Sequence, residues 1–197
     1  IIVRIIAEDN NGNITAFPEN GIKIITPSEA VEKKVLISEA MSLNGNTFAD
    51  EFDEYDDWIE VFNPQKISID LSGKYLTDKI DNLTKWQIPE GTVIPANEFI
   101  LFWCDKDQGQ GKLHTNFRLN ADGEFIAIVD SDGLSIIDSL TLPPMNEDES
   151  LARINNTGDW IITVIPTPGT SNIVTNITGR NLIDKTYEIF AYPNPFN

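Results

Sequence analysis

The sequence predicts an all-β fold, a sandwich of two packed sheets. Short apolar runs recur along most of the 197 residues with turn residues between them, at a spacing typical of sandwiches. Helical periodicity is nearly absent, since only residues 27–34 have the composition for a turn of helix and their apolar positions sustain no stripe. The run at residues 99–104 is apolar at successive positions, which is typical of a strand buried on both faces.

Eight apolar runs supply the predicted strands of the main domain. They lie at residues 35–41, 58–63, 74–77, 99–104, 124–129, 134–140, 150–154 and 160–165. We expect residues 99–104 to form a central strand, and we expect Glu60 in the second run to find a backbone or cationic partner if its face is buried. Between the fifth and sixth runs, the string Asp130-Ser131-Asp132-Gly133 carries the Asp-Gly signal of a tight hairpin.

Residues 1–25 show a strand, a turn and further strand signals. Apolar runs at residues 1–7, 14–17 and 22–25 accompany the turn string Asn10-Asn11-Gly12-Asn13. Two or three short strands bury too little surface for a core of their own. The string AEDNNGNITAFPENG resembles the end of a fibronectin-type or immunoglobulin-like module, so we expect residues 1–26 to end a preceding β-domain. Residues 27–34 would then form a linker.

The composition predicts one well-cored domain and argues against several classes of function. A hydrophobic fraction of 41% and a charged fraction of 23% lie near globular averages. The net charge of -17 repels nucleic acids and anionic membranes and suits a soluble extracellular surface. No apolar run approaches the roughly 18 residues of a membrane span, so no membrane insertion is expected. The opening string IIVRII is typical of a strand and not of a translation start, so we expect a fragment of a longer protein.

The residues needed for catalysis are scarce. The single histidine, His114, stands in an expected loop or strand start, where we expect a structural role ahead of metal contact or catalysis. No Gly-x-Ser-x-Gly elbow is present, and the GQGK string at residues 109–112 departs from the phosphate-binding loop at two positions. The single cysteine, Cys104, has apolar neighbours and is expected to be a buried structural thiol. The sequence therefore predicts that the chain is not an enzyme and needs no cofactor.

Among the possible ligands, the acidic residues best suit a calcium ion. It takes several oxygen ligands from carboxylates and carbonyls. Two acidic loops offer such ligands, Asp53 and Asp56 within residues 50–57, and Asp105 and Asp107 within residues 105–109. The second loop departs from the EF-hand pattern, and a solvated acidic surface is the alternative for both.

The four tryptophans leave two interpretations open. Trp86, Trp103 and Trp160 would suit an aromatic face for sugars. Each lies in or beside an apolar strand, as does Trp58, so core packing is the prediction.

Several strings, in order, resemble one known family. DDWIEVFNPQKISIDLSGKYLTD at residues 56–78 is similar to the signature of lamin tail domains. WQIPEGTVIPANEFILFWCDKD at 86–107 resembles their turn into a central hydrophobic strand, and LHTNFRLNADGEFIAIVDSDG at 113–133 resembles their bacterial branch. TPGTSN at 167–172 is similar to their closing motif. The resemblance covers residues 35–172 and implies an immunoglobulin-like β-sandwich with no catalytic residues of its own.

A second resemblance stands at the end of the chain. The string AYPNPFN at residues 191–197 resembles the opening of the C-terminal sorting domain read by type IX secretion, after a linker at residues 173–190. Together the two resemblances imply a secreted or cell-surface bacterial protein.

The expected function is that of a non-catalytic accessory module. It would act in protein interaction, adhesion or domain spacing, with a protein or cell-surface component as partner and an oligomeric state that stays open. The alternative is a calcium- or glycan-binding module that uses the acidic loops.

Overall fold

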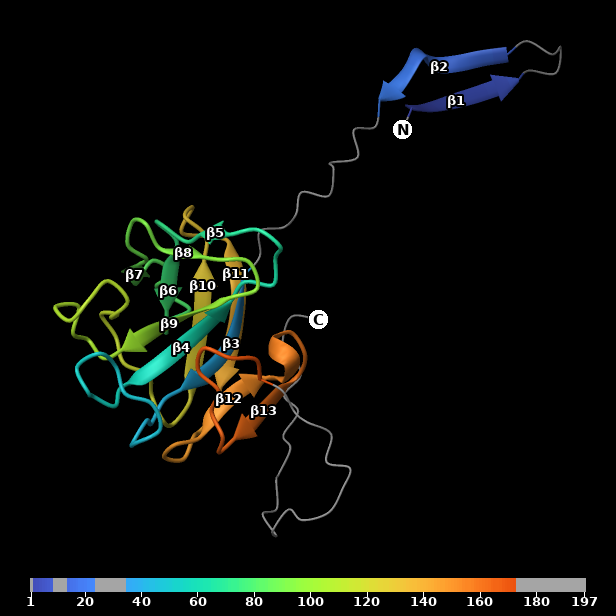
Figure 1. The fold of residues 1–197 in the computed structure, drawn as a ribbon. Helices are drawn as coiled ribbons and strands as arrows, with labels where there is room; N and C mark the ends of the chain where they lie inside the picture. The colour runs from blue at the N-terminus through green and yellow to red at the C-terminus, as the bar shows by residue number, and fades with distance from the viewer. Residues whose placement is uncertain (1, 9–13, 24–34, 173–197) are drawn as a thin grey trace, which may run out of the picture. The chain divides into compact units, whose positions relative to one another are not determined.

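The computed structural model of the chain describes residues 2–8, 14–23 and 35–172. The chain divides into two compact units, Ile1–Lys33 and Lys34–Asn197 (Figure 1). The expected linkers at residues 27–34 and 173–190, and the expected start of a sorting domain at 191–197, lie outside the described residues. Within the described ranges, no helix has the length and apolar character needed to cross a membrane.

The first unit contains an antiparallel hairpin. β1 (Ile2–Glu8) pairs with β2 (Ile14–Lys23), with a register shift between Val3 and Ile5. The predicted runs at residues 14–17 and 22–25 thus belong largely to one long strand. That this hairpin ends a preceding β-domain stays a prediction.

The second unit is built on a five-stranded antiparallel sheet, in the order β13-β12-β3-β4-β9. Its strands are β3 (Leu36–Met41), β4 (Asp57–Phe62), β9 (Phe99–Cys104), β12 (Ser150–Arg153) and β13 (Trp160–Thr163). A short 3-10 turn, η1 (Ile154–Asn156), joins the last two strands.

A four-stranded sheet in the order β11-β10-β6-β7 forms the other layer. Its strands are β6 (Tyr75–Thr77), β7 (Trp86–Gln87), β10 (Glu124–Val129) and β11 (Ile136–Leu142), while β5 (Ile69–Asp70) and β8 (Val93–Ile94) pair separately. Each of the eight predicted runs overlaps a strand, and the β10 to β11 hairpin turns at Gly133, whose φ is 69°. The all-β fold is confirmed.

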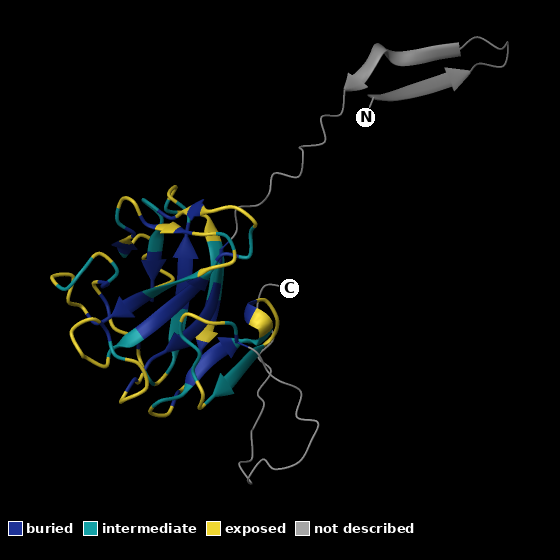
Figure 2. Cartoon of the chain, in the orientation of Figure 1, coloured by how far each residue is buried: buried dark blue, intermediate teal, exposed yellow. Residues whose placement is uncertain are grey.

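The main core lies between these sheets (Figure 2). Its largest fully buried side chains include Phe102 from β9 and Phe117 from the β9 to β10 connection. Cys104 is fully buried among them, as expected, and burial raises the pKa of its thiol.

The prediction that residues 99–104 form a central strand is wrong, because β9 is an edge strand of the five-stranded sheet. β9 is apolar on both faces although it is not a central strand. Phe102 faces the main core, while Trp103 joins Trp58 and Met41 in a second small cluster. Phe48, from the β3 to β4 loop, stacks on Trp103 with 5.8 Å between ring centroids. A loop therefore covers the face that a neighbouring layer would otherwise bury.

Two buried glutamates attach the closing motif to the sheet. Glu39 on β3 and Glu60 on β4 are register partners, and both are fully buried. Glu39 accepts hydrogen bonds from the N–H and hydroxyl of Thr167, and Glu60 accepts one from the N–H of Gly169. Glu60 thus has the backbone partner predicted for it, and the TPGTSN string has a structural role.

Candidate functional site

The β3 to β4 loop, residues 42–56, is ordered by its own polar side chains. Asn44 donates from Nδ2 to the carbonyls of Phe48 at 2.7 Å and Asp56 at 2.9 Å. Asp50 accepts the N–H groups of Phe52 at 2.8 Å and Glu54 at 2.9 Å, both through Oδ1. These side chain to backbone bonds take the place of ladder hydrogen bonds, as in Asx turns. The loop therefore presents its side chains in a defined arrangement.

The connection from β9 to β10 lies along the free edge of β9. Trp103 donates its N–H to Leu113 O at 2.9 Å, and Thr115 donates its N–H to Trp103 O at 2.8 Å. Residues 113–115 thereby continue the hydrogen bonding of the sheet edge. Because His114 lies between these two bonds, its imidazole is held beside the acidic loop.

His114 is buried, with 1% of its surface exposed, and carboxylates face both ring nitrogens. Nδ1 hydrogen-bonds Asp105 Oδ2, while Nε2 lies 3.4 Å from Glu51 Oε1. Gly111 leaves room for this approach, since a Cβ there would lie 3.2 Å from His114 Cδ2 and 3.3 Å from Glu51 Oε1. The second glycine of the GQGK string therefore lines this group of side chains.

The carboxylates around His114 favour the positively charged form of its imidazole. Burial by itself lowers the pKa of His114, but the hydrogen bond and charge of Asp105, with those of Glu51, raise it above its usual value. Burial also raises the pKa of Asp56, and the neighbouring charges of Asp105 and Asp50 raise it further. The crowded carboxylates thus repel one another and attract cations.

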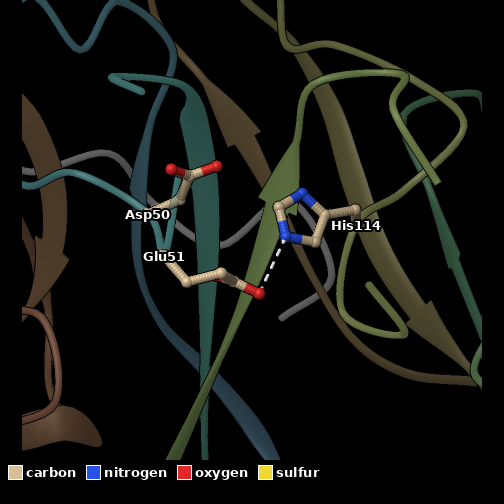
Figure 3. A group of neighbouring side chains, drawn as sticks. All are labelled: Asp50, Glu51 and His114. Atoms are coloured by element: carbon tan, nitrogen blue, oxygen red, sulfur yellow. Dashed lines mark hydrogen bonds and ion pairs between the residues drawn. The ribbon is translucent and has the colours of Figure 1, made fainter. Parts of the chain in front are cut away.

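Two overlapping groups of side chains meet the spacing of a metal site. Asp50, Glu51 and His114 offer one ligand atom each, all within 4.8 Å of one another (Figure 3), and so do Asp50, Asp56 and Asp105. Asp50 belongs to both groups. The β3 to β4 loop and the β9 to β10 connection therefore converge on one candidate cation site.

The comparison with protein families decides what kind of module carries this site. A family model described as the Lamin Tail Domain matches residues 28–143, more than half of the chain. The chain belongs to the lamin tail domain family. No curated protein and no solved structure matches it. The immunoglobulin-like β-sandwich expected of a lamin tail domain is confirmed by the two packed antiparallel sheets.

The lamin tail domain brings together only two of the four predicted calcium ligands. Asp56 and Asp105 converge with Asp50. Asp53 is exposed at a positive φ of 61°, and Asp107 is exposed with Oδ1 accepting the N–H of Gly109 at 3.1 Å, so neither belongs to the two groups. Calcium binding itself stays a prediction.

Sequence reasoning did not select Asp50, Glu51 or His114 as ligands, and metal contact was ranked below a structural role for His114. Asp50 and Glu51 stood inside the acidic run considered for calcium, but nothing in that run marked the buried carboxylates. His114 lies 63 residues beyond Glu51 in the chain, and only the pairing of residues 113–115 with β9 brings the two together. The sole available signal was a lone histidine following a second acidic loop.

Core packing is confirmed for three of the four tryptophans. Trp58, Trp86 and Trp103 are at most 6% exposed. Trp160 is half-buried, and the Arg153 guanidinium lies 4.4 Å from the centroid of its ring. Tryptophan rings therefore form no exposed sugar-binding face in the described part of the domain.

In residues 35–172 the exposed aromatic side chains lie on the β3 to β4 loop instead, where Phe48 is 41% exposed. Phe52 is 51% exposed and Tyr55 is 48% exposed, on either side of Asp53 and Glu54. Aromatic rings at this exposure, on a loop fixed by internal hydrogen bonds, are typical of interaction surfaces. The same loop thus carries both the candidate cation ligands and a candidate contact surface.

Proposed function

We propose that this lamin tail domain is a non-catalytic accessory module of a secreted or cell-surface protein, which binds a protein or cell-surface component through its β3 to β4 loop. The sandwich would also space the domains on either side of it. The single observation that carries the proposal is the exposure of Phe52 and Tyr55 on a loop that is otherwise acidic and internally hydrogen-bonded.

Exposed aromatic rings favour binding over a purely structural loop. Burial of each ring against a partner would gain roughly 1.5–3 kcal/mol of transfer free energy, which solvent exposure leaves unused. Phe48 in the same loop, 41% exposed, already stacks on Trp103 and so attaches the loop to the sheet. Phe52 and Tyr55 therefore project from an ordered loop, which reduces the entropy cost of binding.

The environment of the histidine supports a non-catalytic role. A nucleophile needs a base within hydrogen-bond reach, and the chain has one histidine. Its ring nitrogens face Asp105 and Glu51, and not a serine, threonine or cysteine side chain. A secreted or surface location is supported by the net charge of -17, which keeps a domain soluble in the absence of a partner.

Binding to cells that produce the parent protein tests the proposal. Fluorescently labelled domain would be titrated onto these cells and compared with the double variant F52S/Y55S. A matched control, I80S/L134S, removes two exposed apolar side chains, 65% and 78% exposed, that lie outside the loop.

We expect saturable binding by the wild type and the control, and a loss of affinity of about 100-fold or more in the loop variant. Equal binding by all three proteins, or none by the wild type, would overturn the proposal. Hydrolase activity of the purified domain would overturn its non-catalytic part.

A further inference from the structure

The Asp50 carboxylate has one oxygen without a partner. The residue is only 8% exposed, and its Oδ1 is occupied by the N–H groups of Phe52 and Glu54. Oδ2 is buried and receives no hydrogen bond from the described residues. Nearly all buried polar atoms in folded proteins have partners, so an orphaned carboxylate oxygen points to a bound ion or water.

The neighbours of that oxygen decide which partner it would take. His114 Nδ1 is engaged by Asp105, and the other ring nitrogen, Nε2, faces Glu51. A proton on Nε2 would serve a single acceptor, and the 3.4 Å between Nε2 and Glu51 Oε1 exceeds the roughly 2.8 Å of a charge-assisted hydrogen bond. Such a proton would still leave Asp50 Oδ2 without a donor.

One metal ion would serve as a partner for the side chains of Asp50, Glu51 and His114 together. Zinc bonds to imidazole nitrogen and carboxylate oxygen are about 2.1 Å long, so two ligands on a tetrahedral ion lie roughly 3.4 Å apart. The distance from His114 Nε2 to Glu51 Oε1 is 3.4 Å, and Asp50, Glu51 and His114 each offer one ligand atom within 4.8 Å of the other two (Figure 3).

We propose that Asp50, Glu51 and His114 form a binding site for a divalent transition-metal ion of the zinc class. Asp105 acts behind the site, since a carboxylate on the second ring nitrogen fixes the tautomer and orientation of a metal-bound histidine. Two carboxylates balance the charge of the ion. The side chain of Glu51, 58% exposed, lies at the entry from solvent. The inference is independent of the partner proposed above.

The same contacts favour zinc over calcium. A calcium ion would use the group of Asp50, Asp56 and Asp105 and needs six to eight oxygen ligands. Both oxygens of Asp105 are already engaged, Oδ1 by the N–H of Asp107 at 2.8 Å and Oδ2 by His114. Imidazole nitrogen, by contrast, is a preferred ligand of zinc and related metals.

Calorimetric titration of the untagged domain with zinc chloride tests the site. Excess magnesium at physiological ionic strength would suppress general attraction to the acidic surface. Three variants accompany the wild type: H114Q, E51Q and D53N. D53N is the matched control, because it removes one negative charge from the same loop and asparagine tolerates the positive φ of 61° at that position.

We expect one zinc ion per chain, an affinity lowered by about tenfold or more in E51Q, and no site in H114Q. D53N should bind like the wild type. Since H114Q alters a buried side chain and can fail to fold, E51Q carries the test, with circular dichroism and melting temperature without metal as its folding check.

Three results would overturn the inference. They are no zinc binding by the wild type, equal weakening in E51Q and D53N, or tighter binding of calcium than of zinc in parallel titrations. The last result would assign the cation site to Asp50, Asp56 and Asp105.

Discussion

Asp138 on β11 accepts the backbone N–H of Ile37 on β3, with 2.9 Å between Oδ2 and N. The bond joins the two layers of the sandwich, because β11 and β3 belong to different sheets. It forms at the register shift between Ile37 and Glu39, where a bulge takes a residue out of the regular ladder. Arg153 donates to the same oxygen at 2.8 Å and, through Nε, to Ile37 O at 3.0 Å.

Replacing Asp138 by alanine should destabilise the domain strongly. The buried N–H of Ile37 would lose its acceptor and Arg153 would lose its carboxylate partner, at a cost of about 2–4 kcal/mol in the free energy of unfolding. D138N keeps a side-chain oxygen and should lose less. Urea unfolding followed by tryptophan fluorescence measures both variants. Equal stability of D138A and wild type would show that this bond contributes nothing to sheet packing.

Ionisation of Glu60 should lower the stability of the domain as the pH rises from about 4.5 to 7. Burial raises the pKa of this carboxyl from 4.5 to about 7. In this range the folded protein holds a proton that the unfolded chain has released, so the stabilisation present below pH 4.5 is lost as the pH approaches 7. The loss attributable to Glu60 is at most on the order of 3 kcal/mol.

The variant E60Q separates this contribution from those of other groups. Its amide stays neutral, and Ser38 can turn its hydroxyl toward Glu60 O, which already lies 3.3 Å away. The difference in unfolding free energy between E60Q and wild type should therefore shift in favour of E60Q as the pH rises to 7. A difference that is constant from pH 4.5 to 7 would contradict a raised pKa for Glu60.

Gly123 should tolerate no side chain. Its φ is 96°, and a Cβ there would lie 2.7 Å from the carbonyl oxygen of Leu142. G123A should cost about 2 kcal/mol or more in the free energy of unfolding. G91A is the matched control, since Gly91 has a φ of 75° but no atom within 4 Å of an added Cβ. Chemical denaturation measures both variants. Equal losses of stability in G123A and G91A would mean that the contact between the added Cβ and Leu142 O costs no free energy.

The strands were predictable because their side chains carry the signal. Alternating or continuous apolar runs mark β3, β4, β9 and β10, whose side chains fill the core. The two-residue strands β5, β7 and β8 escaped prediction, since a pair of residues shows no periodicity. The edge position of β9 also escaped, because a run that is apolar on both faces does not reveal whether a strand or a loop covers the second face.

The candidate site was predictable only in part, since its members come from two distant segments. The acidic loops were visible as clusters of carboxylates, and Asp56 and Asp105 do converge. What the sequence hides is which carboxylates are buried. Asp50 is buried and Asp53 is exposed although they stand three positions apart, because Asp50 accepts the N–H groups that shape the loop.

The imidazole nitrogens of His114 offer the most direct test of the account that two loops meet to hold a cation. The chain has one histidine, so a long-range proton to nitrogen-15 spectrum contains one imidazole. On addition of one equivalent of zinc, we expect a shift of Nε2 to a metal-bound position, with Nδ1 still protonated toward Asp105. Imidazole signals that do not change with zinc would contradict the account.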